Sequence, residues 1–467
     1  MTRVEEATAD RLPGAPGPRG RHGRDVVVVG GGLAGITAAL RCADAGHRVT
    51  LVEAKPRLGG LTYSFRRGDL LVDNGQHVFL RCCTAYRALL DRLGVTDQVV
   101  LQDRLDIRVR SPRGRQARLR RGRLPAPLHL AGSLLRYRLL TPAQRLRFAR
   151  AALAMRAVDR ADPATDLRTF ADWLAEHRQD AATIDAMWDL IGVATLNARA
   201  ADASLAAAAM VFQVGLLTDA SAADVGWAAV PLQRLHGDAA ATALAAAGAQ
   251  VHTGTQVRAV EESAGGWTVR TADRDLPADD VILALPAFAA MRVAPAAVRP
   301  IAAASAELGT SPIVNLHVVV DRPVLDGPFV AGVGTPVQWI FDRTAQSGLQ
   351  DSGQYLAVSL SAADAYVDQP VAELRKRFLP EMAALLPSMR GAEVTDFFVT
   401  RERDATWRPS PGSASVRPGA ATPAPGILLA GAWTDTGWPA TMEGAVRSGE
   451  AAAAAVVDRP VRQGVGQ

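Results

Sequence analysis

The sequence contains almost no lysine and little cysteine. Lys55 and Lys376 are the two lysines among 52 basic residues, so arginine carries nearly all of the positive charge. The three cysteines, Cys42, Cys82 and Cys83, form neither an even set nor a metal-ligand spacing, which argues against a disulfide framework and a cysteine-bound metal. The adjacent pair leaves two interpretations, a strained disulfide or two reduced thiols, and we favour the second.

A long apolar run is also absent. No stretch reaches the roughly 18 consecutive apolar residues expected of a membrane-spanning helix. Residues 1–23 are rich in Pro, Gly and Arg without the apolar core of a signal peptide, so we expect a disordered leader there and a disordered tail at residues 459–467. We expect a cytoplasmic protein that is soluble or bound peripherally to the inner face of the cell membrane.

What the sequence does contain is a nucleotide-binding signature. Gly30, Gly32 and Gly35 follow the continuous β-branched run DVVVVG and open a segment with helical spacing. The first glycine permits a tight turn, the second a close approach to a pyrophosphate, and the third close packing of helix on strand. Glu53 ends a second predicted strand about twenty residues later, where an acid accepts hydrogen bonds from ribose hydroxyls.

A second glycine segment follows this acid. Gly59 and Gly60 allow another stretch of backbone to approach the pyrophosphate, with Arg57 as a cationic partner. Plain nicotinamide enzymes do not need this segment, so it favours FAD as the cofactor. Only one GxGxxG motif is visible, so we expect an external electron donor, or a reductant that binds without a second Rossmann site.

This arrangement resembles the FAD-dependent amine oxidase and phytoene desaturase superfamily, whose FAD domain is of the glutathione-reductase type. The resemblance implies that the flavin is held by three separated pieces of chain. The central piece is GTQVRAVEE, whose Val257 backbone would meet the adenine. The third is the strand–loop–helix segment AGAWTDTGWPATMEGAVRSG, with Gly431 in its loop and Met442 at the helix start beside the isoalloxazine.

Residues 73–94, 191–204 and 434–449 resemble a narrower family, the squalene-associated FAD-dependent desaturases, now described as hydroxysqualene dehydroxylases. The resemblance implies reduction of hydroxysqualene, a C30 isoprenoid, to squalene in hopanoid biosynthesis, with hydride passing from reduced flavin N5 to an allylic cation-like centre. Two positions depart from the family, since Ala432 stands where an acid is usual and Leu61 stands where a basic residue usually follows the glycine pair. Asp435 is the candidate to replace that acid.

Such a reaction needs a proton donor near the flavin inside an apolar, water-excluding tunnel. The catalytic candidates are His77, Gln76 and Asp73, all in the polar segment DNGQH, and the alternative is that they form turn hydrogen bonds. The candidates for substrate contact are Asn197, Trp227, Trp433 and Trp438. Helix capping for the asparagine and simple packing for the tryptophans are the alternatives. We expect no metal site.

The order of predicted elements indicates an α/β protein. We expect a discontinuous FAD-binding Rossmann domain of the glutathione-reductase type, combined with a substrate domain of mixed sheet and helices. The predicted FAD domain comprises residues 24–81, 227–288 and 424–458. Residues 82–226 are expected to form a helical insertion that faces the substrate or a membrane, and residues 289–423 the sheet of the substrate domain.

Residues 104–123 carry nine arginines and one acid, Asp106. Nucleic-acid binding is disfavoured because aromatic residues are not interleaved. A solvated hairpin is one interpretation. In the other, the arginines attract anionic lipid while the apolar segment LPAPLHLAGSLL enters the membrane interface, where a C30 substrate would be found.

Three other functions stay open. A carotenoid-type desaturase or isomerase would use the same fold in the oxidative direction. A flavin amine oxidase is disfavoured, because Thr441 stands where those enzymes usually have an aromatic residue and neither lysine is well placed near a flavin. A non-catalytic prenyl-lipid carrier would not need the intact glycine set.

Overall fold

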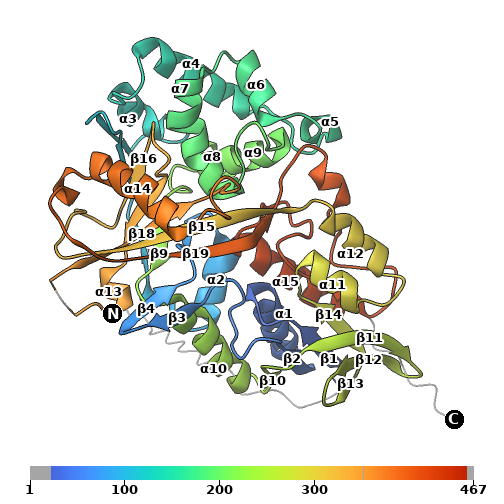
Figure 1. Ribbon diagram of the computed structural model, residues 1–467. Coiled ribbons are helices and arrows are strands. Elements are labelled where there is room, and N and C mark those ends of the chain that lie inside the picture. Colours follow the sequence, from blue (N-terminus) through green and yellow to red (C-terminus); the bar gives the residue numbers. More distant parts are fainter. Residues whose placement is uncertain (1–22, 351, 460–467) are drawn as a thin grey trace, which may run out of the picture.

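The computed structural model describes residues 23–350 and 352–459. The predicted leader up to residue 22 and the predicted tail from residue 460 lie outside the described residues. Figure 1 shows three regions, namely a parallel sheet with its helices, a large mixed sheet, and a group of helices at the opposite end from the parallel sheet.

The parallel sheet takes its strands from three distant parts of the chain. Its order is β10–β2–β1–β14–β20, and all neighbouring strands are parallel. The strands are β10 (Gln250–His252), β2 (Arg48–Val52), β1 (Asp25–Val29), β14 (Asp280–Leu283) and β20 (Ile427–Leu429). Central strand β1 is a run of valines because both of its faces are buried.

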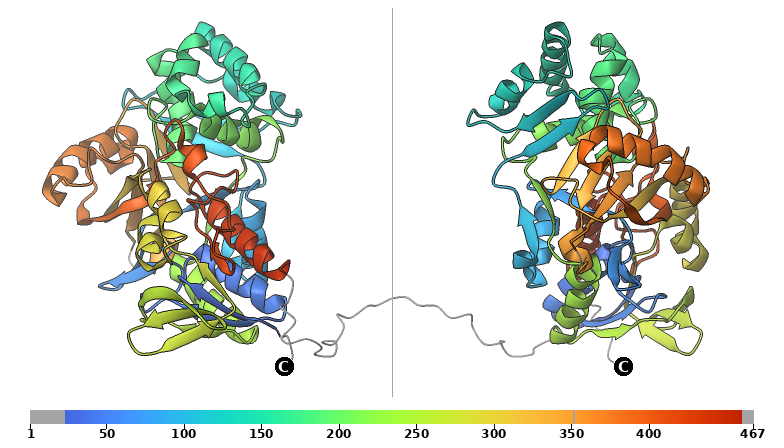
Figure 2. Two further views of the ribbon diagram at one scale, coloured as in Figure 1. Left: turned by 90° about the vertical axis from the view of Figure 1, so that its right-hand side faces the viewer. Right: turned by 60° about the vertical axis from the view of Figure 1, so that its left-hand side comes forward.

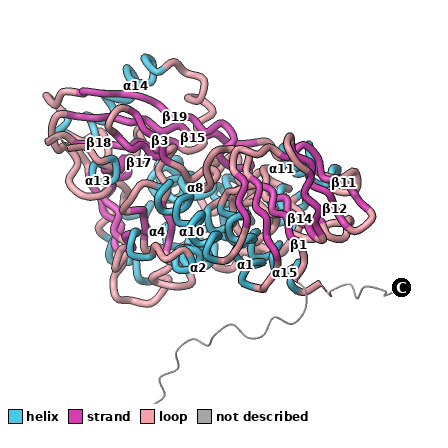
Figure 3. Tube along the Cα trace, turned by 90° about the horizontal axis from the view of Figure 1, so that it is seen from below, coloured by secondary structure: helices cyan, strands magenta, loops and turns pink. Residues whose placement is uncertain are grey.

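Different elements pack against the two faces of this sheet. Val26 and Val28 face a core shared with α1 (Leu33–Asp44), α2 (Thr84–Arg92), α10 (Ala239–Ala246) and α15 (Met442–Val457), helices that gather on one side in Figure 3. Val27 and Val29 face a three-stranded antiparallel sheet and helix α11 (Ala287–Val293). That sheet consists of β11 (Val257–Ser263), β12 (Gly266–Thr271) and β13 (Asp275–Ala278). This architecture confirms the predicted FAD-binding fold class.

The large mixed sheet has the order β19–β15–β18–β17–β16–β7–β8. Its strands are β19 (Val394–Trp407), β15 (Thr310–Val320), β18 (Gln354–Leu360), β17 (Trp339–Asp342), β16 (Phe329–Gly332), β7 (Asp106–Arg110) and β8 (Gln116–Arg120). Helix α14 (Val371–Leu385) packs on it through Leu374, Phe378 and Met382. The last two strands lie in the segment predicted to be a helical insertion, so residues 82–226 are not helical throughout.

The remaining elements connect these regions. The helical end of the molecule contains α3 (Ala131–Leu135), α4 (Pro142–Met155), α5 (Pro163–Asp166), α6 (Phe170–Glu176), α7 (Ala181–Thr183), α8 (Asp189–Leu196) and α9 (Leu205–Phe212), and the views in Figure 2 show these helices at one end of the molecule. Two small sheets are formed by β3 (Ser64–Arg67) with β4 (Leu70–Asp73), and by β5 (Val78–Leu80), β9 (Val225–Ala228) and β6 (Val99–Leu101). Short helices α12 (Arg299–Ala306) and α13 (Thr344–Ser347) complete the set of α-helices in the described residues.

No helix in the described ranges combines the length and the apolar character needed to cross a membrane. Cys42, Cys82 and Cys83 are free thiols, in agreement with the favoured reduced interpretation.

Candidate functional site

The first glycine loop leaves no room for side chains at two of its positions. A Cβ atom on Gly35 would lie 1.8 Å from the carbonyl oxygen of Gly30, and one on Gly30 would lie 2.2 Å from the carbonyl oxygen of Ala284. Helix α1 begins at Leu33 without a side-chain cap. Its first N–H groups and the positive end of its dipole are therefore suited to a bound phosphate.

The second glycine segment packs directly on the first. The Gly59 N–H donates to the carbonyl oxygen of Gly31 over 2.8 Å, and a Cβ atom on Gly60 would lie 2.8 Å from the Cα of Gly32. Gly60 also has a φ of +59°, a conformation that favours glycine. Arg57 donates to the Gly60 carbonyl over 3.0 Å, which steadies this segment, while its role as a pyrophosphate partner stays a prediction.

Glu53 lies at the end of β2, beneath the first loop. Its carboxylate accepts the N–H of Gly31 over 2.6 Å and the N–H of Lys55 over 2.7 Å. The Glu53 carbonyl accepts the N–H of Thr255 over 2.9 Å, two residues before buried Val257 at the start of β11. The acid predicted for the ribose and the residue predicted for the adenine are thus brought to the same edge of the sheet.

The C-terminal strand–loop–helix unit lies beside the N-terminal one. Strand β20 pairs with β14, and β14 in turn pairs with β1. A Cβ atom on Gly449 would lie 2.2 Å from the carbonyl oxygen of Ala34, so α15 can pack against α1 only because residue 449 is glycine. Both helices begin at the carboxyl edge of one parallel sheet, where ligands bind in open α/β folds.

Three predicted cofactor residues belong to this C-terminal unit. The N–H of Gly431, whose φ is +140°, donates to Oγ of Ser448 over 2.8 Å. Met442 is the first residue of α15 and packs against the core beneath it. Asp435 is exposed, and its carboxylate accepts the N–H of Gly437 over 3.0 Å, so a contact of Asp435 with the cofactor stays a prediction.

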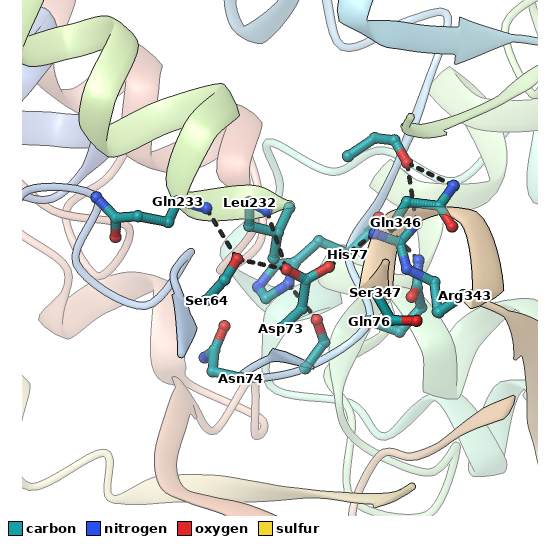
Figure 4. Close-up of polar contacts among 12 residues, drawn as sticks. Ser64, Asp73, Asn74, Gln76, His77, Leu232, Gln233, Arg343, Gln346 and Ser347 are labelled. Carbon is teal, nitrogen blue, oxygen red and sulfur yellow. Dashed lines mark hydrogen bonds and ion pairs between the residues drawn. The ribbon is translucent and has the colours of Figure 1, made fainter. Parts of the chain in front are cut away.

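Asp73 lies at the centre of a polar network (Figure 4). One carboxylate oxygen accepts the Ser64 hydroxyl over 2.6 Å and the Leu232 N–H over 2.9 Å, and the other oxygen accepts from Arg343 over 2.7 Å. Arg343 also donates to the carbonyl of Ala228 over 2.9 Å. These bonds join β4, the segment after β9 and the mixed sheet, and they favour a structural role for Asp73.

His77 and Gln76 lie on the loop that follows Asp73, but their side chains make fewer hydrogen bonds than the Asp73 carboxylate does. Nδ1 of His77 lies 3.0 Å from the carbonyl oxygen of Gly75, which requires a proton on that nitrogen for a hydrogen bond. Burial lowers the pKa of His77 below its usual 6.5, so its imidazole is neutral at pH 7. The Gln76 side chain donates to the His77 carbonyl over 3.4 Å and the Gln76 backbone N–H to Oδ1 of Asn315 over 3.4 Å, and the residue borders a cavity of about 10 Å³, room for about one water molecule.

Asn197 ends helix α8 in the left-handed conformation, with φ of 51°. Its amide nitrogen donates to the Ser311 carbonyl and to the Thr406 hydroxyl, both over 2.9 Å, and its amide oxygen accepts the Ala362 N–H over 2.6 Å. Its side chain is buried and joins α8 to β15 and β19. These bonds favour the capping alternative over substrate contact, which stays a prediction.

The three tryptophans lie in different surroundings. Trp433 is buried, and its indole N–H donates to the Leu285 carbonyl over 2.8 Å, as expected for packing. Trp438 packs between the FAD-domain helices and the helical end of the molecule. Trp227 on β9 meets Phe329 edge to face, with ring centroids 5.7 Å apart, and Phe329 contacts Trp339 at 6.0 Å.

Sequence reasoning missed two of the groups that surround this region. Phe329 and Trp339 belong to no motif in the sequence, and their clustering with Trp227 depends on tertiary contacts between distant strands. Glu443 is fully buried beside Met442, and its carboxylate accepts the N–H groups of Ala85 and Tyr86 over 3.1 and 2.7 Å. It thereby caps helix α2 from helix α15, a role that no local pattern signals.

The comparisons agree with this geometry. Residues 33–457 match the family described as flavin containing amine oxidoreductase. A hydroxysqualene dehydroxylase of Rhodopseudomonas palustris is 28% identical over 453 residues, which cover 92% of this chain and 97% of that protein. A zeta-carotene desaturase of Capsicum annuum is 25% identical and covers 93% of this chain and 81% of that protein.

Among solved structures, putrescine oxidase bound to putrescine superposes with a TM-score of 0.70 at 21% identity, covering 93% of this chain and 99% of that one. At this identity the likeness shows the fold alone. The glycine cradle fits a dinucleotide, and the family match extends from α1 to α15. The chain therefore belongs to the flavin containing amine oxidoreductase family and is an FAD-dependent oxidoreductase.

Proposed function

We propose that the protein reduces hydroxysqualene to squalene. The allylic C–O bond breaks, the hydroxyl leaves as water after receiving a proton, and a hydride takes its place on carbon. Bound FAD in its reduced form supplies that hydride, and an external electron donor restores the reduced form. The observation that carries the proposal is the similarity to hydroxysqualene dehydroxylases over almost the whole of both chains.

The aromatic cluster of Trp227, Phe329 and Trp339 supports an isoprenoid substrate. It lies where β9 and the mixed sheet meet the core of the helical end. Aromatic faces offer a large apolar surface without hydrogen-bond demands, which suits a hydrocarbon chain and excludes water from a developing cation.

His77 is the proposed proton donor to the departing hydroxyl. Its Nδ1–H is held by the Gly75 carbonyl, so Nε2 is the nitrogen left to meet a substrate. Because burial lowers its pKa, the charged form that can donate from Nε2 is a minor species at pH 7 and becomes more populated as the pH falls.

Thr441 supports this reaction over amine oxidation. Its hydroxyl accepts the N–H of Gly444 over 3.2 Å and so caps helix α15 next to Met442. An aromatic side chain at this position could not make that bond. Because residue 441 is not aromatic, the aromatic wall that amine oxidases place in front of the flavin would be incomplete here.

The decisive experiment is a single turnover. The photoreduced holoenzyme is mixed anaerobically with hydroxysqualene while flavin absorbance is followed, and the products are analysed by mass spectrometry. Reoxidation of the flavin with formation of an equal amount of squalene is the expected result. Flavin that stays reduced in the presence of hydroxysqualene would contradict the proposal.

Carotenoid desaturation is the second candidate, favoured by the similarity to zeta-carotene desaturases. It runs in the opposite redox direction, since a hydride and a proton leave adjacent saturated carbons and oxidised FAD, when bound, would take up the hydride. Incubation of the oxidised holoenzyme with phytoene or dehydrosqualene under anaerobic conditions tests it directly. Bleaching of the flavin with a newly conjugated product would favour this candidate over the dehydroxylase.

A further inference from the structure

The helical end of the molecule has an unusual concentration of exposed leucine. Five large apolar side chains between residues 124 and 153 are at least half exposed, whereas the large apolar side chains exposed elsewhere are spread over the whole described chain. They are Leu124, Leu128, Leu135, Leu146 and Leu153. Leu135 is the most exposed of them, at 75%.

The segments that carry or flank these leucines are joined to one another. Ser133 on α3 exchanges hydrogen bonds of 2.7 and 2.8 Å with the backbone of Arg120 on β8. The guanidinium of Arg145 on α4 donates to the carbonyl of Leu135. Hairpin β7–β8, residues 121–130, helix α3 and helix α4 therefore form one continuous surface, and α3 and α4 lie at the top of Figure 1. We call this the cap surface.

The outer side of α4 shows the pattern of an interfacial helix. Leu146 and Leu153 are seven residues apart, which places them two turns apart on the same face, and Arg150 lies between them. All three side chains are exposed. An apolar stripe with arginine on a solvent-facing helix is typical of a segment that lies in a membrane interface.

Charge on this part of the chain has a single sign. Residues 107–158 contain fourteen arginines and neither aspartate nor glutamate. The whole chain has a net charge of +5, so the residues outside this segment are net acidic. Such asymmetry creates a local positive field that the rest of the molecule does not share.

Only some of these arginines are free to meet a partner. Arg118 and Arg120 form ion pairs with Asp106, and Arg121 pairs over 2.9 Å with fully buried Asp224. These three therefore serve the hairpin and its anchoring.

A second set of arginines faces solvent. Arg113, Arg123 and Arg138 are exposed, and in the described residues no carboxylate lies within ion-pair distance of them.

We propose that the cap surface docks on a bilayer containing anionic phospholipid, with the exposed leucines in the interface and the unpaired arginines against lipid phosphates. Charge complementarity selects this occupant, because phosphates in the lipid head groups match a surface rich in arginine, on which the acids Asp106, Asp180 and Asp326 are already paired with other arginines. A protein partner would need both acidic residues opposite the arginines and apolar pockets that fit the exposed leucines. Docking would bring the helical end of the molecule to the phase in which a C30 substrate dissolves, but the docking itself does not depend on the reaction.

Vesicle flotation of the FAD-loaded protein tests this proposal without any substrate. Vesicles of phosphatidylcholine and phosphatidylglycerol in equal amounts are compared with vesicles of phosphatidylcholine alone. We expect binding to the anionic vesicles that weakens as salt is raised. The triple variant R113E/R123E/R138E should bind on the order of 100-fold more weakly, since each arginine near an anionic surface contributes severalfold to the partition.

Apolar variants provide an independent arm. We expect L128S/L135S to lower the partition on the order of 100-fold, or about tenfold for each leucine that leaves the interface. The matched controls carry the same changes on other surfaces: R66E/R274E/R390E for charge, and V371S/V457S for exposed apolar side chains. Both controls should bind as the unmodified protein does, with flavin content and melting temperature confirming the fold of every variant.

Several outcomes would overturn the proposal. They are an unmodified protein that stays unbound on anionic vesicles, cap variants that bind as well as the unmodified protein, or equal losses in the control variants. A dimer in light scattering that L128S/L135S converts to a monomer would also overturn it, because the cap surface would then be a contact between two copies of the chain.

Discussion

Arg343 and Asp73 form an ion pair of 2.7 Å in which both side chains are largely buried, at 4% and 12% exposure. The two residues are 270 positions apart in the chain and join strand β4 to the mixed sheet. Because the same carboxylate also receives the Leu232 N–H, one side chain ties together three segments that surround the candidate site. This position explains why a polar residue occurs there without requiring that it act in catalysis.

We predict that Asp73→Asn lowers the free energy of unfolding by about 3 kcal/mol, because it leaves the Arg343 charge buried without its partner. Urea denaturation measures the change. Adding Arg343→Met to Asp73→Asn should recover part of the loss, which a double-mutant cycle would detect. Gln76→Ala serves as the control and should change stability by less than about 0.5 kcal/mol. Unchanged stability in Asp73→Asn would contradict the structural role of this ion pair.

The glycine cradle gives a second prediction. In Gly35→Ala the new methyl group would lie 1.8 Å from the Gly30 carbonyl oxygen, so the loop must move away from the position that accepts a pyrophosphate. We expect FAD affinity to fall at least about tenfold, measured as the ratio of flavin absorbance to protein. Gly192→Ala in helix α8, where no atom lies within 4 Å of the added carbon, should retain its flavin. Full flavin content in Gly35→Ala would show that the loop does not carry the cofactor.

A third prediction concerns His77. If it donates the proton, His77→Ala should slow flavin reoxidation by hydroxysqualene about 100-fold or more without loss of bound FAD. The rate of the unmodified enzyme should rise as the pH is lowered below 6.5, because burial lowers the pKa of His77 and the donating form becomes populated only in acid. Single-turnover rates over this pH range are the measurement. A rate that is the same in His77→Ala removes the histidine from the mechanism.

Local patterns were enough to predict the first glycine loop and its acid. Gly30, Gly35 and Glu53 belong to one strand–turn–helix–strand unit, in which each step depends on residues that are close in sequence. The fold class followed from this unit and from the second strand–loop–helix at the end of the chain. Gly449, which permits α15 to pack on α1, carries no such signal because its constraint comes from Ala34, over 400 residues away.

The wrong prediction for residues 82–226 has the same physical origin. The hairpin β7–β8 joins the mixed sheet through the pairing of Val109 with Ala331, and no periodicity within residues 82–226 can indicate a partner that far along the chain. The catalytic role of Asp73 stays a prediction, but its ion pair could not be predicted, because Arg343 lies in another region of the sequence. Buried polar groups acquire their partners from tertiary structure, so their roles are poorly predicted by residue type alone.

Two buried histidines lead to a prediction about acid stability. His236 lies 2.8 Å from the Tyr86 hydroxyl, and His317 lies between the hydroxyls of Tyr355 and Thr400 at 2.6 and 2.9 Å. Burial lowers the pKa of each to about 3, so both stay neutral in the folded protein while the unfolded chain binds protons near pH 6.5. The stability that the neutral histidines contribute is therefore complete above pH 6.5 and is lost as the pH falls toward 3.

For each histidine, the free energy of unfolding should fall by about 1 kcal/mol between pH 6.5 and 5.5, above the range in which carboxylates titrate. Urea midpoints at these two pH values measure the loss, and His317→Gln should show a smaller loss than the unmodified protein. Equal losses in both proteins would mean that His317 does not contribute to the acid sensitivity.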